Sequence, residues 1–137
     1  MKNDPFLLHP RTFLVVDDDP DYQRLLYSLL MNEGYNVLLA GSGSEALEIL
    51  ERHRKNIDGV ITDLCMPQMD GVEFIQRTHK LDSFDEMPPT LVVTGNKDAV
   101  KLEDLDDLGI RNILFKPINK AMLSTAVESF LSEAHVP

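Results

Sequence analysis

Residues 12–20 read TFLVVDDDP, and this stretch decides the fold class. The apolar run at 12–16 stops abruptly at three aspartates, as a buried parallel strand does when its end meets solvent. Pro20 suits the first turn of a helix, where its missing N–H would have no partner. Apolar residues then recur at helical spacing until Gly34 offers a stop, namely Leu25, Leu26, Leu29 and Leu30. The stretch therefore predicts a strand followed by a helix.

The same pattern occurs four more times along the chain. Strand-like apolar runs lie at 36–40, 59–62, 90–93 and 112–115. Helix signals follow each run: a capping box at Ser42 and Glu45, a cap at Asp70 before a helix over about Gly71 to Leu81, a cap at Asn96 and a cap at Asn119. The helix after Asn96 is the weaker one and carries Ala99, Val100, Leu102 and Leu105. Strict alternation of strands and helices predicts an α/β fold, a parallel sheet with helices on both faces.

Composition limits the classes of partner. The chain has 137 residues, 43% of them apolar and 26% charged, which suits one folded domain. Its formal net charge of -10 repels phosphate backbones and anionic membranes, so direct binding to nucleic acid or membrane is not expected. Cys65 is the only cysteine, which excludes an internal disulfide and fits a reducing cytoplasm. Neither a signal sequence nor a run of roughly 18 apolar residues is present, and we expect a soluble protein.

Polar side chains stand at the ends of four of the five predicted strands. In open α/β sheets the functional crevice lies at the carboxyl ends of the strands, near the point where strand order reverses. The residues at those ends are Asp17, Asp18, Asp63, Thr94 and Lys116. We therefore expect these five side chains to gather at one place.

These residue types together suit phosphoryl transfer. Crowded carboxylates repel one another unless a cation sits among them, and Mg²⁺ prefers oxygen ligands and commonly joins carboxylates to a phosphoryl group. A carboxylate can act as the nucleophile toward phosphorus when a metal and a cation such as Lys116 screen the incoming charge. The Thr94 hydroxyl can donate to a phosphoryl oxygen, and Gly95 leaves the approach open because it has no side chain.

Four short segments surround these residues and read VVDDD at 15–19, DLCMPQMDG at 63–71, VTG at 93–95 and KP at 116–117. Together they resemble the CheY-like receiver domain of response regulators in two-component signalling. The resemblance runs from about Thr12 to Leu131, and the joint match of several segments is more specific than any one motif. It implies a flavodoxin-like (βα)5 doubly wound sheet with strand order 2-1-3-4-5. The expected organisation is an N-terminal extension at 1–11, a receiver domain at 12–131 and a C-terminal tail at 132–137.

The resemblance also implies roles for the residues at the strand ends. Asp63 is expected to accept a phosphoryl group from a sensor histidine kinase or a histidine phosphotransfer protein. Asp17, Asp18 and Asp63 are expected to hold Mg²⁺, helped by the backbone carbonyl of Cys65. Such a domain is a signalling switch rather than an enzyme, although it assists its own phosphorylation and dephosphorylation. Its expected partner downstream is another protein or a fused output domain, with the chain a monomer or a phosphorylation-dependent dimer.

The switch itself departs from the family pattern at one position. The resemblance implies that Thr94 and Lys116 move toward the phosphoryl group and that the loop after the fourth strand follows. Three residues before the lysine the family usually has a Tyr or Phe that changes rotamer, and this chain has Ile113. Because isoleucine offers neither ring nor hydroxyl, the usual aromatic part of the switch is in question while phosphorylation is not.

Several other residues are interpreted as structural. Asp19 is the best capping candidate among the three aspartates, and a cap followed by a small residue explains Asp70 and Gly71. Buried gap-filling is expected of Met66 and Met69. Phe115 is expected in the core, and the leucines at 102, 105 and 108 are expected to pack inward with Asp104, Asp106 and Asp107 as the solvated face.

Two alternative functions remain. A phosphate-independent pseudo-receiver would keep the fold as an interaction module, and Ile113 is the one observation in its favour. A haloacid-dehalogenase-like phosphatase also combines a first-strand aspartate, a hydroxyl, a lysine and magnesium, and Asp17-x-Asp19 mimics its opening motif. That family expects a Thr where this chain has Asp21, and it expects an acidic motif that residues 118–137 lack.

Overall fold

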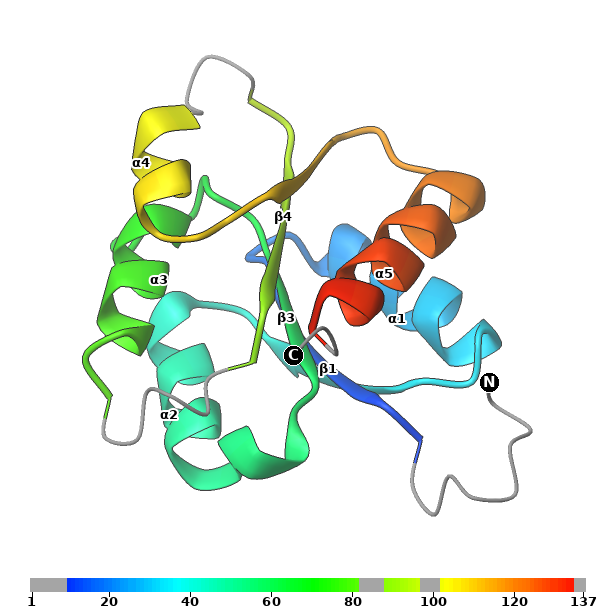
Figure 1. The fold of residues 1–137 in the computed structure, drawn as a ribbon, viewed down its shortest axis with the longest axis horizontal. Helices are drawn as coiled ribbons and strands as arrows, with labels where there is room; N and C mark the ends of the chain where they lie inside the picture. The colour runs from blue at the N-terminus through cyan, green and yellow to red at the C-terminus, as the bar shows by residue number, and fades with distance from the viewer. Residues whose placement is uncertain (1–9, 82–87, 97–101, 135–137) are drawn as a thin grey trace.

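A computed structural model describes residues 10–81, 88–96 and 102–134. Five parallel strands form one sheet in the order β2-β1-β3-β4-β5 (Figure 1). Their bounds are β1 Thr12–Val16, β2 Asn36–Ala40, β3 Gly59–Thr62, β4 Thr90–Thr94 and β5 Asn112–Phe115. The predicted fold class and strand order are therefore confirmed. Because all neighbouring strands are parallel, their carboxyl ends lie along one edge of the sheet.

Helices cover both faces of the sheet. They are α1 Pro20–Asn32, α2 Gly43–His53, α3 Gly71–Thr78, α4 Leu102–Asp107 and α5 Lys120–Ala134, with a short 3₁₀ helix, η1, at Arg54–Asn56. Figure 1 shows α1 and α5 together on one side of the sheet and α2, α3 and α4 on the other. The helices after β1 and β3 thus lie on opposite faces, and this reversal places a crevice between the ends of those two strands. Among the described residues, no helix has the length and apolarity to cross a bilayer.

Two apolar cores, one on each face, fix the sheet between the helices. On the α1 and α5 side the core includes Phe13, Leu26 and Phe130; on the other side it includes Leu14, Leu50 and Phe74. The central strands are almost wholly buried, because they are covered on both faces. Leu25, expected in the apolar stripe of α1, is instead 37% exposed. Its position turns it away from the sheet, whereas Leu26 and Leu30 lie in the core.

Side-chain caps begin α1, α2, α3 and α5 where the sequence predicts them, whereas the turn that follows the cap predicted at Asn96, residues 97–101, lies outside the described residues. The N–H groups of Asp21, Glu73 and Met122 donate to Oδ1 of Asp19, Asp70 and Asn119 at 2.9, 2.8 and 2.9 Å. At α2 the Ser42 hydroxyl accepts the Glu45 N–H at 3.1 Å, but the Glu45 carboxylate accepts from Gly41 at 3.4 Å. The predicted capping box is therefore present with its return bond displaced by one residue. Capping satisfies backbone N–H groups that lack partners within the first turn.

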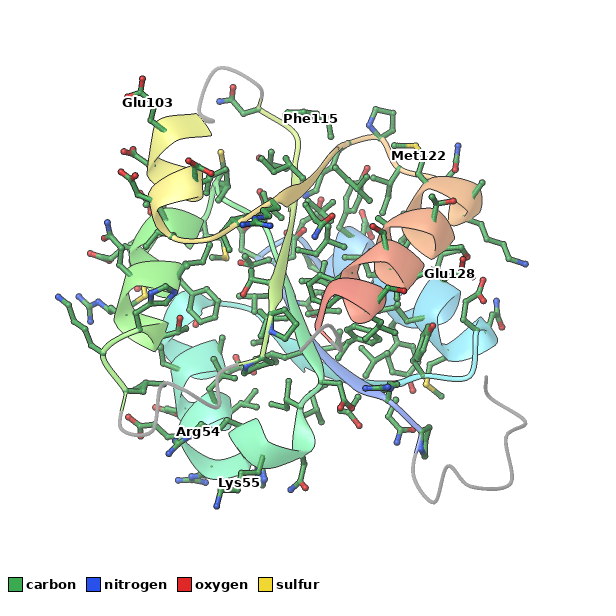
Figure 2. All side chains as sticks on the ribbon, in the orientation of Figure 1. Arg54, Lys55, Glu103, Phe115, Met122 and Glu128 are labelled. Atoms are coloured by element: carbon green, nitrogen blue, oxygen red, sulfur yellow. The ribbon has the colours of Figure 1, made fainter. Side chains whose placement is uncertain are left out.

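Other expectations about elements need correction. Helix α3 ends at Thr78 rather than near Leu81, because the next amides form tight turn bonds such as Leu81 N–H to the Thr78 carbonyl at 3.2 Å. Helix α5 continues to Ala134, into the predicted tail, and the domain boundaries themselves stay predictions. Phe115 is only partly buried and belongs to neither core cluster, and Figure 2 shows it near the edge at which the strands end. Ala99 and Val100 lie outside the described residues.

Helix α4 is expected to pack its leucines inward and to expose its aspartates, and this is confirmed for the side chains that are described. Leu105 is buried and Leu108 packs against the same core, while Asp104, Asp106 and Asp107 are exposed. Figure 2 shows Glu103, on the same helix, pointing away from the sheet. Met66 and Met69 are buried in that core too, as gap-filling residues should be.

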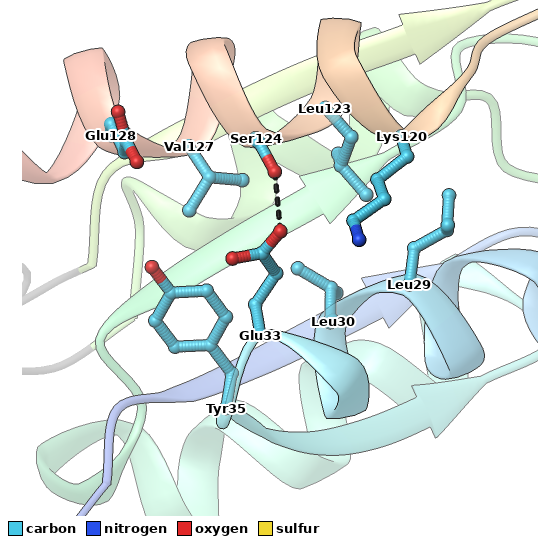
Figure 3. A pocket seen from close by; sticks show the side chains of 9 residues that line it. All are labelled: Leu29, Leu30, Glu33, Tyr35, Lys120, Leu123, Ser124, Val127 and Glu128. Atoms are coloured by element: carbon cyan, nitrogen blue, oxygen red, sulfur yellow. Dashed lines mark hydrogen bonds between the residues drawn. The ribbon is translucent and has the colours of Figure 1, made fainter. Parts of the chain in front are cut away.

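A hydrogen bond between side chains joins the C-terminal end of α1 to α5. The Ser124 hydroxyl donates to Glu33 Oε1 at 2.6 Å, beside Tyr35 and above Leu30 (Figure 3). Leu30 and Val127 surround this bond with apolar surface and line the same small pocket. The α1 and α5 layer is therefore closed by packing and by a hydrogen bond between side chains that are far apart in sequence.

Candidate functional site

Three of the predicted site residues meet at the carboxyl ends of β1, β3 and β5. Asp17 follows β1 and Asp63 follows β3, and these strands pair directly with Val16 opposite Thr62. Lys116 follows β5 at the edge of the sheet and reaches across to both. Its Nζ lies 2.9 Å from Asp17 Oδ2 and 3.0 Å from Asp63 Oδ2. The expectation that these strand ends converge is confirmed for these residues.

This charged group is largely shielded from water. The side chains of Lys116, Asp17 and Asp63 are only 13%, 2% and 7% exposed. Burying charges is costly, and such a pair is a weak source of stability compared with apolar residues of similar size. A buried arrangement of two carboxylates and one ammonium therefore points to a functional requirement. Their net negative charge is what a cation would neutralise.

The surroundings shift the pKa values of two of these groups. Burial raises the pKa of Asp17 above its ordinary value, against the opposing effect of its hydrogen bond to Lys116. For Lys116, burial alone would lower the pKa, but the hydrogen bonds and charges of Asp17 and Asp63 outweigh it and raise the pKa. The ammonium is thus held in its charged form at neutral pH. It supplies a fixed positive charge beside Asp63.

Backbone N–H groups orient the two inner carboxylates. Asp63 Oδ1 accepts from the N–H of Leu64 at 2.6 Å and from that of Cys65 at 3.1 Å. Asp17 Oδ1 accepts from the Asp19 N–H at 2.9 Å. Both lone pairs of Asp63 Oδ1 are thus engaged, whereas Asp63 Oδ2, which accepts from Lys116, has a second lone pair that can bind a further partner. The Asp63 carboxylate is therefore fixed in direction by its own loop and by Lys116.

Asp18 joins Asp17 and Asp63 in a cluster that suits a divalent cation. One carboxylate oxygen from each of the three lies within 4.8 Å of the others, and Asp18 is exposed while its neighbours are buried. Mg²⁺ binds through one or two carboxylates, keeps several waters and takes oxygen ligands, so an all-oxygen cluster open to solvent on one side fits it. The three clustered side chains are all carboxylates, so the Cys65 thiol is not one of them. The backbone carbonyl of Cys65 stays a predicted ligand.

The remaining predicted residues lie around this group. Thr94 ends β4 fully buried, its hydroxyl accepts from the Asn96 N–H at 3.4 Å, and its carbonyl accepts from Lys116 N–H at 2.8 Å. A Cβ at Gly95 would lie 3.6 Å from Lys116 Cδ, an ordinary contact, so the backbone there runs alongside the lysine stem. Ile113 is half-buried and packs against the core beneath α2, α3 and α4. The roles predicted for Thr94 and Ile113 in a switch stay predictions.

Comparison with known proteins identifies the family. The family model of the response regulator receiver domain matches residues 13–128. The chain belongs to this family. It is a receiver domain of the kind found in two-component signal transduction, as its fold and its strand-end motifs predict.

Individual relatives agree with that assignment. The transcriptional regulatory protein GlrR of Escherichia coli is 33% identical over 125 residues, covering 91% of this chain and 27% of that protein. A response regulator receiver domain protein from Clostridium thermocellum has a TM-score of 0.79 at 28% identity over 90% of this chain and 95% of its own. The CheX-CheY-BeF3-Mg complex of Borrelia burgdorferi contains a chain with a TM-score of 0.77 at 28% identity, covering 88% of this chain and 89% of that one. The chain spans about a quarter of the length of GlrR.

Gly71 supports the receiver site in a way that the sequence does not reveal. Its N–H donates to the Leu64 carbonyl at 2.9 Å, and a Cβ at this position would lie 2.2 Å from the Asp63 carbonyl oxygen. The start of α3 therefore touches the backbone of Asp63 itself. The helix-cap interpretation of Asp70 is confirmed, but Gly71 is more than a small residue after a cap. The preceding turn contains Gln68 at φ 68°, a left-handed conformation that non-glycine residues adopt at some cost.

We expect Gly71→Ala to lower the free energy of unfolding by about 2–3 kcal/mol, because backbone atoms cannot give way to the added methyl group without moving the Asp63 loop. In a helix free of such contacts the same change is stabilising by about 1 kcal/mol. Urea unfolding of the two proteins measures the difference. Gly95→Ala is the matched control, since its Cβ meets only the lysine stem. Equal stability of Gly71→Ala and the wild type would contradict the close packing.

Two residues of the first turn of α1 complete the site and were missed by the sequence analysis. The Gln23 amide Nε2 donates to the Asp17 carbonyl at 2.5 Å and to the Ala40 carbonyl at 3.4 Å, tying the ends of β1 and β2 together. The Tyr22 ring lies under Lys116, with Nζ 4.0 Å from the ring centroid. Their position five and six residues after Asp17 was the only signal available, and it does not by itself indicate contact.

Proposed function

We propose that this receiver domain accepts a phosphoryl group on Asp63 in a reaction that depends on Mg²⁺. The observation that carries the proposal is the placement of the Lys116 ammonium between Asp17 and Asp63, with Asp18 beside them. A structural ion pair would need one carboxylate. Three carboxylates and one lysine at the open end of a parallel sheet instead supply a nucleophile, a cation and a set of metal ligands.

In the proposed step an oxygen of the Asp63 carboxylate forms a bond to the phosphorus of the donor. The bond between phosphorus and the donor's leaving group breaks, and its electron pair leaves with that group, a histidine nitrogen or the acetate of acetyl phosphate. Lys116 and the Thr94 hydroxyl bind the equatorial phosphoryl oxygens. Asp17, Asp18 and Asp63, with the Cys65 carbonyl, would hold Mg²⁺, which would supply positive charge to offset the negative charge of the phosphoryl group. The oxidation state of phosphorus does not change during the transfer.

The partners follow from this chemistry. The phosphoryl donor is a sensor histidine kinase or a histidine phosphotransfer protein, and the domain acts in the cytoplasm. Its signal reaches a downstream protein or an output domain of a longer chain, either as a monomer or through a phosphorylation-dependent dimer. The net charge of -10 disfavours direct contact with nucleic acid or an anionic membrane.

The proposed output passes through Thr94 and the neighbouring β5 strand. A phosphoryl group that draws the Thr94 hydroxyl inward favours one position of the neighbouring backbone at Gly95 and Asn96 over another, and such a difference in binding energy is what a two-state switch requires. Ile113 is half-buried against the core, where a smaller side-chain movement replaces the rotation of an aromatic ring. Ile113 also supports the second candidate, a phosphate-independent pseudo-receiver, whereas no observation favours a haloacid-dehalogenase-like phosphatase.

Incubation with acetyl phosphate separates the receiver from the pseudo-receiver. With Mg²⁺ present we expect intact-mass spectrometry to show a gain of one phosphoryl group. Addition of EDTA before the donor should lower the rate of that gain by at least about 100-fold, because the carboxylates and the incoming anion then repel one another. A wild-type protein that gains no phosphoryl group with saturating Mg²⁺ would favour the pseudo-receiver. A gain that is equally fast in EDTA would contradict the proposed metal dependence.

A further inference from the structure

The aromatic ring of Tyr22 is the third partner of the Lys116 ammonium. Tyr22 lies in the first turn of α1, and Lys116 follows β5, so the two residues come from distant parts of the chain. The Lys116 Nζ is 4.0 Å from the centroid of the ring. The negative face of an aromatic ring attracts a cation within about 6 Å, and the attraction is stronger when the cation is desolvated.

The ring and the two carboxylates together enclose the ammonium. Nζ carries three N–H donors, and two of its hydrogen bonds go to Asp17 and Asp63 at 2.9 and 3.0 Å. With the side chain only 13% exposed, the ring takes a side of the cation that water would otherwise occupy. The position of the ammonium therefore depends on Tyr22 as well as on its ionic partners.

Phosphoryl transfer changes the ionic partners of Lys116 but leaves the ring in place. When Asp63 uses an oxygen to bind phosphorus, or when a metal binds Asp17, the hydrogen bonds of Lys116 to these carboxylates must be exchanged. Tyr22 carries no charge, is no metal ligand and packs against the core beneath α1 and α5. It is the contact that can hold the ammonium beside Asp63 while the other contacts change.

We propose that Tyr22 is a positioning residue for phosphoryl transfer in this domain: its ring holds the Lys116 ammonium at the place where the phosphoryl oxygens arrive. The inference rests on the proposed function, because it assumes that Lys116 binds the phosphoryl group. It goes beyond that function by adding an aromatic residue of α1 to the machinery. It also makes the ring, and not the phenol hydroxyl, the part that matters.

The proposed role of the Tyr22 ring can be tested by measuring the rate of phosphorylation by acetyl phosphate at saturating Mg²⁺. Tyr22→Leu keeps an apolar side chain and removes the ring, and we expect its rate constant to fall about fivefold to thirtyfold. Tyr22→Phe keeps the ring face and should stay within about threefold of the wild type. Tyr27→Leu is the matched control, since Tyr27 is on the same helix and 41% exposed, away from the core.

A spectroscopic measurement tests the stacking without any phosphoryl donor. A methylene group over an aromatic face is shifted upfield in the proton NMR spectrum by the ring current. The Lys116 Cε protons should be upfield-shifted in the wild type and in Tyr22→Phe, and should return to ordinary lysine positions in Tyr22→Leu. Tyr22→Met, an unbranched and adaptable replacement, repeats both measurements if the leucine variant unfolds.

The outcomes separate the inference from the proposed function. A slow Tyr22→Leu with a near-normal Tyr22→Phe and the expected NMR shifts supports the inference. Wild-type rates in Tyr22→Leu, or a Tyr22→Phe as slow as Tyr22→Leu, overturn it while leaving phosphorylation of Asp63 intact. A wild-type protein that takes up no phosphoryl group overturns the proposed function, and the role of Tyr22 in phosphoryl transfer with it.

Discussion

Asp63→Asn is expected to abolish the mass gain from acetyl phosphate completely. An amide is a far weaker nucleophile than a carboxylate, and among the described residues no other carboxylate lies between Lys116 and two backbone N–H groups. The fold should survive, because the amide oxygen can still accept from Leu64 and Cys65. We expect the free energy of unfolding to stay within about 1 kcal/mol of the wild type.

Asp70→Asn is the matched control for this loss. Asp70 is exposed and caps α3 through the Glu73 N–H, and asparagine is an equally good cap. This variant should take up the phosphoryl group at the wild-type rate. If Asp63→Asn still gained one phosphoryl group at that rate, another residue would be the acceptor.

Lys116→Met should have the next largest effect, a fall of about 10²- to 10³-fold in the rate of phosphorylation. Removing one preorganised positive group from a shielded site has this magnitude in other reactions that develop negative charge. Methionine has a similar length and flexibility but no charge. The variant therefore removes the attraction for the phosphoryl oxygens while filling most of the same space.

The same variant should bind Mg²⁺ about tenfold more tightly, because the ammonium no longer repels the metal or occupies Asp17 and Asp63. Calorimetric titration with Mg²⁺ measures this change, and intact-mass kinetics measure the rate. Lys120→Met is the control, since Lys120 is exposed at the start of α5. Slower phosphorylation together with weaker Mg²⁺ binding would mean that the site had collapsed, which contradicts the roles assigned here.

Much of the fold could be predicted from the sequence, because the pattern repeats. Each apolar run that stops at a polar residue is a strand of the parallel sheet, and the predicted caps at Asp19, Ser42, Asp70 and Asn119 are present. The clustering of Asp17, Asp63 and Lys116 follows from topology, since parallel strands end at one edge. Local signals and topology agree at these positions.

The parts that could not be predicted depend on contacts between distant segments. The contact of Tyr22 with Lys116 spans almost the whole chain, and Gly71 is needed only because α3 begins against the Asp63 backbone. Helical periodicity includes Leu25 in an apolar stripe, but the face of α1 that packs on the sheet is centred on Leu26 and Leu30 and leaves Leu25 exposed. An apolar strand pattern likewise includes Phe115, although β5 is an edge strand that is covered incompletely.

The buried charges of Asp17, Asp63 and Lys116 suit the proposed switch better than a purely structural role, because buried ion pairs are a weak source of stability. Burial raises the pKa of Asp17, which means that the hydrogen bond to Lys116 does not fully offset the cost of burying the carboxylate charge. A metal and a phosphoryl group would each replace contacts that the inner carboxylates now make with the lysine. Binding of either would therefore be coupled to a rearrangement of Lys116, whose neighbours Thr94 and Tyr22 belong to different elements.

Locating the phosphoryl group is the most direct test of the central claim that Asp63 is the acceptor. Borohydride reduces an aspartyl phosphate to homoserine, and peptide mass spectrometry then identifies the changed residue. After treatment with acetyl phosphate and Mg²⁺, the account predicts homoserine at position 63 and at no other aspartate. Homoserine at position 17 or 18, or a phosphoryl group that resists borohydride and remains on another side chain, would contradict it.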